Sequence, residues 1–276
     1  MKLKTKKIAK LTSIIVGIII VLIHIISMLT LDKQIEYKEI TFQSPKISAE
    51  MDGYRIAFIC DTHTTNAQEL EDVVTKLNDL EIDLLLLGGD YTTRVAKTDF
   101  TMEILSQIET VDGIYGIEGN HDKYVVLFEA MEKYSIQPLS NSGVYIRDNL
   151  YIAGVEDLWN RKPDIQMAVG EADTSDFVIL LAHNPDVTML QNTEKIDLIL
   201  SGHTHGGQVT LFGIWAPALE LRGFVTDFRQ RFKSGWAKSR DGVSVYISNG
   251  TGKASYSKAP RIFARPQVII VNLISE

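Results

Sequence analysis

Two histidines, His203 and His205, stand one residue apart among glycines in the segment SGHTHGGQ. Three more, His63, His121 and His183, also lie in short polar stretches that directly follow apolar runs. Imidazoles collected in this way, together with carboxylates, are typical ligands of divalent transition metals. The spacing therefore indicates a metal site, and the glycines would let a tight loop bring two imidazoles beside it without steric conflict.

The polar stretches supply two carboxylates, one amide and four imidazoles as candidate metal ligands. They are Asp61, His63, Asp90, Asn120, His183, His203 and His205. This mixture of oxygen and nitrogen ligands suits Mn²⁺, Fe or Zn²⁺ better than Mg²⁺. Thiolate sites with C-x-x-C spacing are excluded, because Cys60 is the single cysteine. Seven ligands exceed what one ion needs, so we expect two ions about 3.5–4 Å apart that share a bridging carboxylate.

Each polar stretch follows a short apolar run with the composition of a buried strand. The runs are YRIAFIC, IDLLLLG, GIYGIEG, FVILLA and IDLILSG, and turn residues bound them. Residues 67–80, 99–110 and 123–134 are helix candidates between the runs. Strands that alternate with helices predict an α/β fold, in which ligand sites lie beyond the carboxyl ends of the strands.

The N-terminus has the composition of a membrane anchor. The first ten residues hold five lysines and no acidic residue, and Leu11–Leu31 contains no charged residue. About 20 apolar residues suffice to cross a bilayer as a helix. A cleaved signal peptide is the alternative, but it usually has a shorter apolar region and a small-residue cleavage site. We predict a cytoplasmic basic segment at 1–10, one transmembrane anchor at 11–31 and a domain at 32–276 outside the cytoplasm, in the cell membrane.

Charge is unevenly distributed along the chain. The formal net charge is −7, yet Leu221–Arg265 holds ten Lys or Arg residues against two acidic ones. A nucleic-acid-binding domain is usually basic overall, so we expect no nucleic-acid partner. The basic stretch suits a small anionic substrate or an anionic membrane surface, and a solvated surface is the alternative.

Three aromatic residues in the same stretch, Phe224, Phe228 and Phe232, are spaced four apart. In a helix this spacing would align the three rings on one face. The functional interpretation is a lid that docks on lipid, and the alternative is that the rings pack onto the core.

In chain order, the polar stretches form five short motifs. They read Asp61-Thr62-His63, Gly89-Asp90, Gly119-Asn120-His121-Asp122, His183 and Gly202-His203-Thr204-His205. This order resembles that of the calcineurin-like metallophosphoesterases, with D-x-H, G-D, G-N-H-D/E, a lone His and G-H-x-H. The N-terminal apolar segment and GHTHGGQ are similar to the bacterial membrane-associated phosphodiesterase-like branch, itself similar to enzymes that cleave the pyrophosphate of UDP-diacylglucosamine.

The resemblance implies a sandwich of two mixed β-sheets flanked by helices, with a dinuclear metal site in the loops at the strand ends. By position in the motifs, the first ion would be held by Asp61, His63, Asp90 and His205, and the second would be completed by Asn120, His183 and His203. Asp90 would bridge the two ions. His121 would bind no metal and would instead stabilise the phosphoryl oxygens or protonate the leaving group, oriented by Asp122.

The resemblance also implies an activity and its cofactors. We expect two divalent ions, Mn²⁺ first and Fe or Zn²⁺ as alternatives. The expected reaction is hydrolysis of phosphodiester or pyrophosphate bonds at the membrane surface, with a lipid-linked phosphate ester as a candidate substrate. A phosphomonoesterase of the same fold and a non-catalytic metal-binding scaffold are the alternatives.

Overall fold

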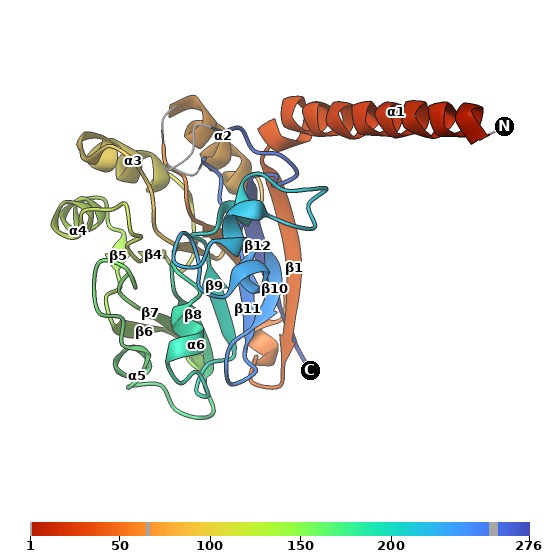
Figure 1. Cartoon of the computed structure of the whole chain (residues 1–276). Coiled ribbons are helices and arrows are strands. Elements are labelled where there is room, and N and C mark those ends of the chain that lie inside the picture. The colour runs from red at the N-terminus through yellow and green to blue at the C-terminus, as the bar shows by residue number, and fades with distance from the viewer. Residues whose placement is uncertain (1, 65–66, 254–258) are drawn as a thin grey trace.

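The computed structural model describes residues 2–64, 67–253 and 259–276, which form two six-stranded β-sheets with helices on their outer faces and one long N-terminal helix (Figure 1). The first sheet has the strand order β1-β12-β2-β3-β4-β5, and the second has the order β10-β11-β9-β8-β7-β6. Both sheets contain parallel and antiparallel pairs. The predicted sandwich of two mixed sheets is therefore confirmed.

The central parallel strands of each sheet place their carboxyl ends at one edge. The first sheet contains β1 (Glu36–Ser44), β2 (Arg55–Ile59), β3 (Leu84–Leu87), β4 (Ile114–Gly116), β5 (Gln137–Pro138) and β12 (Gln267–Ser275). The second contains β6 (Ser142–Arg147), β7 (Leu150–Gly154), β8 (Phe177–Leu181), β9 (Leu198–Ser201), β10 (Gly235–Lys238) and β11 (Ser244–Ile247). The strands β2, β3 and β4 run parallel, as do β7, β8, β9 and β11. Loops that follow these strands are therefore gathered at one edge of each sheet.

The helices predicted between the strands are present and cover the first sheet. They are α2 (Ala67–Asn78), α3 (Thr98–Leu105) and α4 (Tyr124–Lys133). The helix α3 ends five residues earlier than predicted, where the Ser106 hydroxyl turns back to donate to the carbonyl of Glu103. Two shorter helices, α5 (Ile165–Ala168) and α6 (Val187–Leu190), pack on the second sheet.

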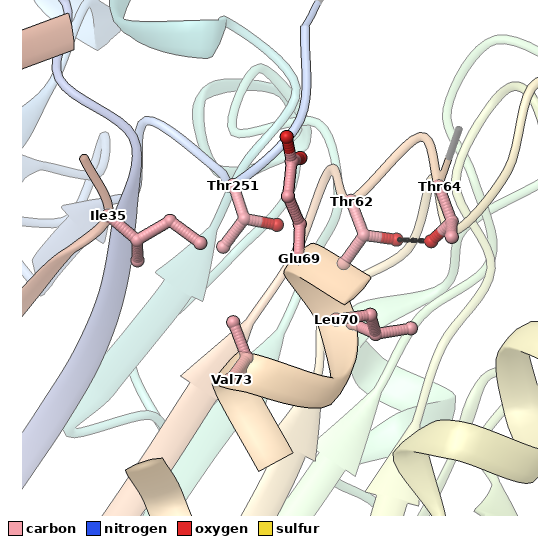
Figure 2. A pocket seen from close by; sticks show the side chains of 7 residues that line it. All are labelled: Ile35, Thr62, Thr64, Glu69, Leu70, Val73 and Thr251. Atoms are coloured by element: carbon pink, nitrogen blue, oxygen red, sulfur yellow. Dashed lines mark hydrogen bonds between the residues drawn. The ribbon is translucent and has the colours of Figure 1, made fainter. Parts of the chain in front are cut away.

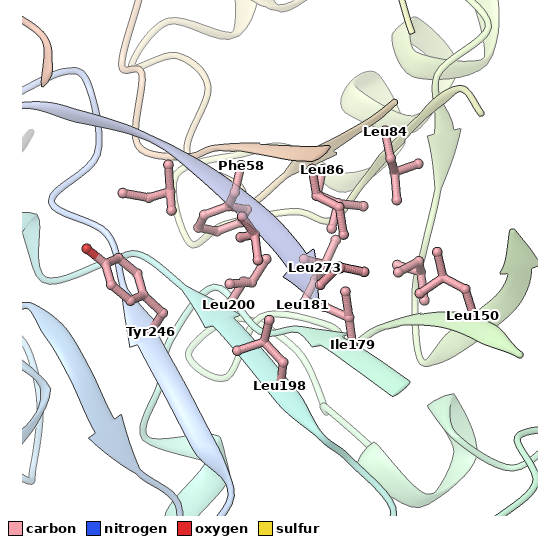
Figure 3. Close-up of a cluster of buried hydrophobic side chains, with 14 of the residues drawn as sticks. Phe58, Leu84, Leu86, Leu150, Ile179, Leu181, Leu198, Leu200, Tyr246 and Leu273 are labelled. Atoms are coloured by element: carbon pink, nitrogen blue, oxygen red, sulfur yellow. The ribbon is translucent and has the colours of Figure 1, made fainter. Parts of the chain in front are cut away.

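The main core lies between the two sheets. Side chains alternate along β2, so that Phe58 points toward the second sheet while Ala57 and Ile59 point toward the helices. Figure 3 shows Phe58 and Leu86 of the first sheet near Leu200 of the second. All of these side chains are buried. Close packing on both faces holds the strands, and hence the loops that follow them, in fixed positions.

The N-terminal helix α1 (Lys2–Leu29) projects away from the sandwich (Figure 1). The segment from residue 6 to residue 33 is long and apolar enough to cross a membrane. An 18-residue stretch within it has a mean hydropathy of 2.9, and 6% of that stretch is buried. The helix includes the basic residues before the predicted anchor, and a short 3₁₀ turn at Leu31–Lys33 joins it to β1. The predicted anchor thus coincides with a helix that lies largely outside the body of the protein.

The helical lid predicted for Phe224, Phe228 and Phe232 is wrong. Phe232 is fully buried and Phe228 is partly buried, both in the cluster under the second sheet, whereas Phe224 is exposed. The described part of the stretch holds only a 3₁₀ turn at Arg229–Phe232 rather than a continuous helix. The reason is a long-range contact: the Asp186 carboxylate accepts hydrogen bonds from the Thr226 hydroxyl and the Asp227 amide, which fixes a bend before the turn.

Candidate metal centre

The seven predicted ligands meet at one edge of the sandwich, where the parallel strands of both sheets have their carboxyl ends. They are, in chain order, Asp61 and His63 after β2, Asp90 after β3, Asn120 after β4, His183 after β8, and His203 and His205 after β9. Six of these side chains are buried, and that of Asn120 is partly buried. Residues up to 144 positions apart in the chain therefore form one polar cluster.

The first group of ligand atoms comes from Asp61, His63 and His205, and these atoms lie within 4.8 Å of one another. The Nε2 atoms of His63 and His205 are 3.2 Å apart. An oxygen of Asp61 is 3.4 Å from Nε2 of His205, and an oxygen of Asp90 is 3.5 Å from Nε2 of His63. The four side chains converge on one small region, as ligands of a single ion do.

The second group adds His183 to the two carboxylates. The ligand atoms of Asp61, Asp90 and His183 also lie within 4.8 Å of one another. The Asn120 amide oxygen is 3.2 Å from Nε2 of His183 and 2.8 Å from Nδ1 of His203. The same Asp90 oxygen that faces His63 is 3.4 Å from Nε2 of His183. This carboxylate therefore stands between the two groups, where a bridging ligand is needed.

Backbone carbonyls fix the ring orientation of two histidines. Nδ1 of His183 is 2.8 Å from the carbonyl oxygen of Gly88, and Nε2 of His203 is 2.9 Å from that of Val225. A carbonyl oxygen only accepts, so these two nitrogens carry the protons in the neutral rings. The opposite nitrogens, which face Asn120, keep their lone pairs for a metal, as is usual for metal-binding histidines.

The charges of the cluster also fit bound cations. Burial lowers the pKa of His63 to about 4 and that of His203 to about 3, so both rings are neutral at pH 7. Burial opposes the charged form of His183 as well, but the neighbouring carboxylates, Asp90 foremost, outweigh it and hold its pKa well above the usual range. The buried carboxylates therefore require positive charge beside them, and divalent ions would supply it.

The loops that carry the ligands have strained backbones. Five ligands have φ angles between 40° and 70°, in the left-handed region that residues other than glycine rarely adopt: Asp61, His63, Asp90, His203 and His205. Neighbouring glycines make room for them. A Cβ at Gly202 would lie 2.2 Å from a carboxylate oxygen of Asp61, and one at Gly119 would lie 2.3 Å from an oxygen of Asp90. Glycine at these two positions thus lets the loops approach the carboxylates of Asp61 and Asp90.

Asp122 and His121 lie next to the second group but differ in their surroundings. The Asp122 carboxylate accepts hydrogen bonds from the backbone amides of Asp90, Gly119 and Tyr91, at 2.7, 2.8 and 3.1 Å. Its hydrogen bonds thus connect the loop after β3 to the loop after β4. His121 donates its backbone amide to an Asp90 oxygen at 2.8 Å, while its side chain is exposed. The ring of His121 therefore lies at the mouth of the site.

The mouth contains an aromatic residue that the sequence motifs did not single out. Trp159 lines a small cavity of about 20 Å³ together with Val225 and several ligands. Its ring stands edge-on to that of His203, with centroids 4.6 Å apart. The neighbouring Asn160 donates to the backbone carbonyl of Asn120 at 2.6 Å. The signal was present in the sequence, since the polar stretch EDLWN also follows an apolar run, that of β7.

A second cavity of about 20 Å³ lies between the loop after β2 and the start of α2 (Figure 2). Thr62 and Thr64, Thr251 and the first turn of α2 line it, and none of the predicted metal ligands does. The Thr64 hydroxyl donates to that of Thr62 at 3.2 Å. This cavity has room for about one water molecule.

The fold and this cluster define an α/β protein with a candidate two-ion centre at its strand ends. A model of the calcineurin-like phosphoesterase family matches residues 54–207, more than half of the chain and a range that includes every predicted ligand. The chain therefore belongs to the calcineurin-like phosphoesterase family.

Several relatives share most of this chain. It is 29% identical over 246 residues to a Danio rerio "transmembrane protein with metallophosphoesterase domain", covering 81% of this chain and 54% of that protein. An uncharacterized metallophosphoesterase of Helicobacter pylori (strain J99) is 28% identical, covering 84% and 62%. One from Aquifex aeolicus is 30% identical over 201 residues, covering 69% and 72%. The chain thus spans less than two thirds of the length of the first two relatives.

Proposed function

We propose that the chain is a two-metal phosphoesterase that hydrolyses phosphodiester or pyrophosphate bonds of a lipid-linked substrate at a membrane surface. One observation carries the proposal: the Asp90 carboxylate faces both His63 and His183, and the exposed His121 stands beside it. Membership of the family and the apolar helix α1 support it. The likeness of the sequence to enzymes that cleave the pyrophosphate of UDP-diacylglucosamine suggests the substrate class.

The two ions would divide the ligands as the motif order implies. The first would be held by Asp61, His63, Asp90 and His205, and the second by Asp90, Asn120, His183 and His203. When bound, divalent ions supply positive charge to the phosphate oxygens and activate water for attack. Mn²⁺ is the ion we favour, with Fe or Zn²⁺ as alternatives, because a mixture of carboxylate, amide and imidazole ligands suits these ions better than Mg²⁺.

His121 and Asp122 would complete the site without binding metal. The ring of His121, exposed at the mouth, would donate a proton to the leaving oxygen or stabilise the phosphoryl oxygens. Asp122 would act as a positioning residue, since it holds the backbone amides of Asp90 and Gly119. Asp90 in turn accepts a hydrogen bond from the backbone amide of His121. Asp122 would therefore fix the position of the His121 ring relative to the Asp90 carboxylate.

The anchor would place the site outside the cytoplasm. The lysines at the start of α1 would stay on the cytoplasmic side, and residues 32–276 would lie on the other. Protease added to intact cells, or to spheroplasts where there is an outer layer, should digest the domain while a cytoplasmic control protein survives. Complete protection of the domain would contradict this topology.

A substrate panel with defined metals tests the activity. The full-length protein in detergent should lose activity in EDTA and regain it with Mn²⁺. Bis-p-nitrophenyl phosphate and a lipid-linked pyrophosphate should be hydrolysed faster than p-nitrophenyl phosphate. Faster turnover of the monoester would make the protein a phosphomonoesterase. Bound metal without turnover of any substrate would indicate a non-catalytic scaffold.

A further inference from the structure

The loop that follows the metal ligands of β9 exposes apolar side chains. Residues 209–216 leave the strand-end edge just after His205 and turn back on themselves, with Leu211 and Trp215 paired across the turn. Ile214 at the tip is 77% exposed, and Leu211, Phe212 and Trp215 are exposed as well. Four exposed apolar side chains within five residues are unusual for a surface in water.

Several backbone polar groups of this loop, in contrast, are bonded within the protein. The Leu211 amide donates to the carbonyl of Trp215 at 2.8 Å, and the Gly213 amide donates to the Thr210 hydroxyl at 2.9 Å. The Lys233 ammonium donates to the carbonyls of Gly213 and Ile214. Backbone groups that are already paired lose less on leaving water than unpaired ones do, and the Lys233 ammonium would lie at the level of the headgroups.

The loop lies against the apolar helix α1. The ring of Phe212 is 4.6 Å from that of His24, measured between centroids, and the ring of Phe263 is 5.0 Å from it. Between helix and loop runs an apolar groove of about 370 Å³, lined by Ile20, Val21, His24, Ile25, Met28, Leu211 and Ile262. The Asp32 carboxylate, which accepts from the amides of Phe263 and Ala264, fixes the end of the helix to the same region.

The contact with α1 determines how deep the loop would lie in a membrane. Ile20 and His24 lie nine and five residues before the end of α1 at Leu29. At 1.5 Å per residue these are distances of roughly 13 and 8 Å along the helix. If α1 crosses the bilayer, side chains packed beside these positions stand at the level of the lipid rather than in water. The contacts with α1 and the exposed tip therefore place the apolar loop beside acyl chains.

We propose that residues 211–215 are a second membrane contact, which inserts into the lipid beside the C-terminal half of α1. This inference rests on the membrane anchoring proposed above. Ile214 and Leu211 would enter the acyl region, and Trp215 would sit at the interface that tryptophan prefers. Because the loop begins four residues after the ligand His205, the contact would hold the metal centre at a fixed height over the headgroups.

A fluorescent label at the loop tip tests the proposal. The native Cys60 is buried, so Ile214→Cys can be labelled selectively with an environment-sensitive NBD group in the full chain. The matched control is Met167→Cys, 67% exposed on α5, at a distance from α1 (Figure 1). Both proteins are placed in phosphatidylcholine–phosphatidylglycerol vesicles with or without doxyl-labelled lipid. The label at 214 should shift to the blue and lose roughly half of its emission to the doxyl lipid, whereas the label at 167 should not change.

The other outcomes overturn the proposal in distinguishable ways. An unquenched label at 214 in a protein that resists carbonate extraction would refute the loop contact and leave the anchor intact. A blue shift without doxyl quenching would show that protein covers the loop, either a second copy or another partner. Carbonate extraction of the whole protein would refute both the anchor and the loop contact. Hydrolysis of a soluble diester by both labelled variants confirms that they are folded.

Discussion

The strand-end edge with the predicted ligands and the segment from residue 209 to residue 232 are neighbours in space. They differ in which side chains they bury and which they expose. At the edge, the seven predicted ligands meet from five separate loops, and five of these seven residues have strained backbones. In the segment, apolar side chains are exposed at Leu211–Trp215 while Phe232 is buried. Strain is kept where chemistry needs a fixed geometry. Exposed apolar surface is typical of a contact with a partner, which we propose to be lipid for residues 211–215.

The largest expected effect is at Asp90, the residue that we propose to bridge the two ions. In the proposed centre the Asp90 charge is shared by both ions, so Asp90→Asn should lose bound metal and more than about 100-fold in activity, since even residues behind a ligand cost 10–100-fold. Asp99→Asn on α3, an exposed aspartate, is the control. Metal analysis and kinetics of the purified variants measure both effects. Full metal content in Asp90→Asn would contradict the bridging role.

The next effect is at His121, where the variant should lose activity but no metal. His121→Ala should lower kcat by roughly 10²–10⁴-fold, the usual contribution of a general acid, and keep the metal content of the wild type. Metal content and kcat measured on the same preparation separate this role from that of Asp90. Loss of an ion from His121→Ala would instead make this residue a ligand.

The third prediction compares the stability of variants at two aromatic positions of the segment, Phe232 and Phe224. Phe232→Ala should lower the free energy of unfolding by about 3–5 kcal/mol, because it opens a cavity in the cluster under the second sheet. Phe224→Ala, at an exposed position, should change it by less than about 0.5 kcal/mol. Denaturation of the two variants measures the difference. Equal effects would mean that the two rings have similar environments.

The same contrast explains what the sequence could predict. The ligands were identifiable because each follows a strand-like run, and parallel strands bring such loops to one edge whatever the details of packing. The aromatic segment was misread because spacing by four indicates one helical face only if a helix forms. Here hydrogen bonds from Thr226 and Asp227 to Asp186, some 40 residues earlier in the chain, fix the bend. The exposed loop at 211–215 was also missed, because its contact with α1 depends on tertiary structure.

The smallest expected effect concerns Glu118, a carboxylate near the metal centre that is not a predicted ligand. Its side chain is buried, and its Oε2 has no hydrogen-bond partner in the described parts of the chain. Burial raises the pKa of Glu118 from the usual 4.5 to about 7, although Arg161 lies 3.3 Å from its other oxygen. Arg161 makes a shorter pair, 2.6 Å, with Glu156, so its charge is shared.

The raised pKa of Glu118 gives the sign of a pH effect on stability. Below pH 4.5 the Glu118 carboxyl is protonated in both the folded and the unfolded protein. Between pH 4.5 and about pH 7 it is protonated only in the folded protein. The unfolded chain therefore binds fewer protons in this window, and stability should fall as the pH rises through it. Glu118→Gln keeps the shape but cannot ionise, so its melting temperature should fall less than that of the wild type between pH 5 and pH 7.5. Glu129→Gln, on the exposed face of α4, should follow the wild type. Parallel profiles for Glu118→Gln and the wild type, at equal metal content, would show that Glu118 is ionised in the folded protein and that Arg161 outweighs burial.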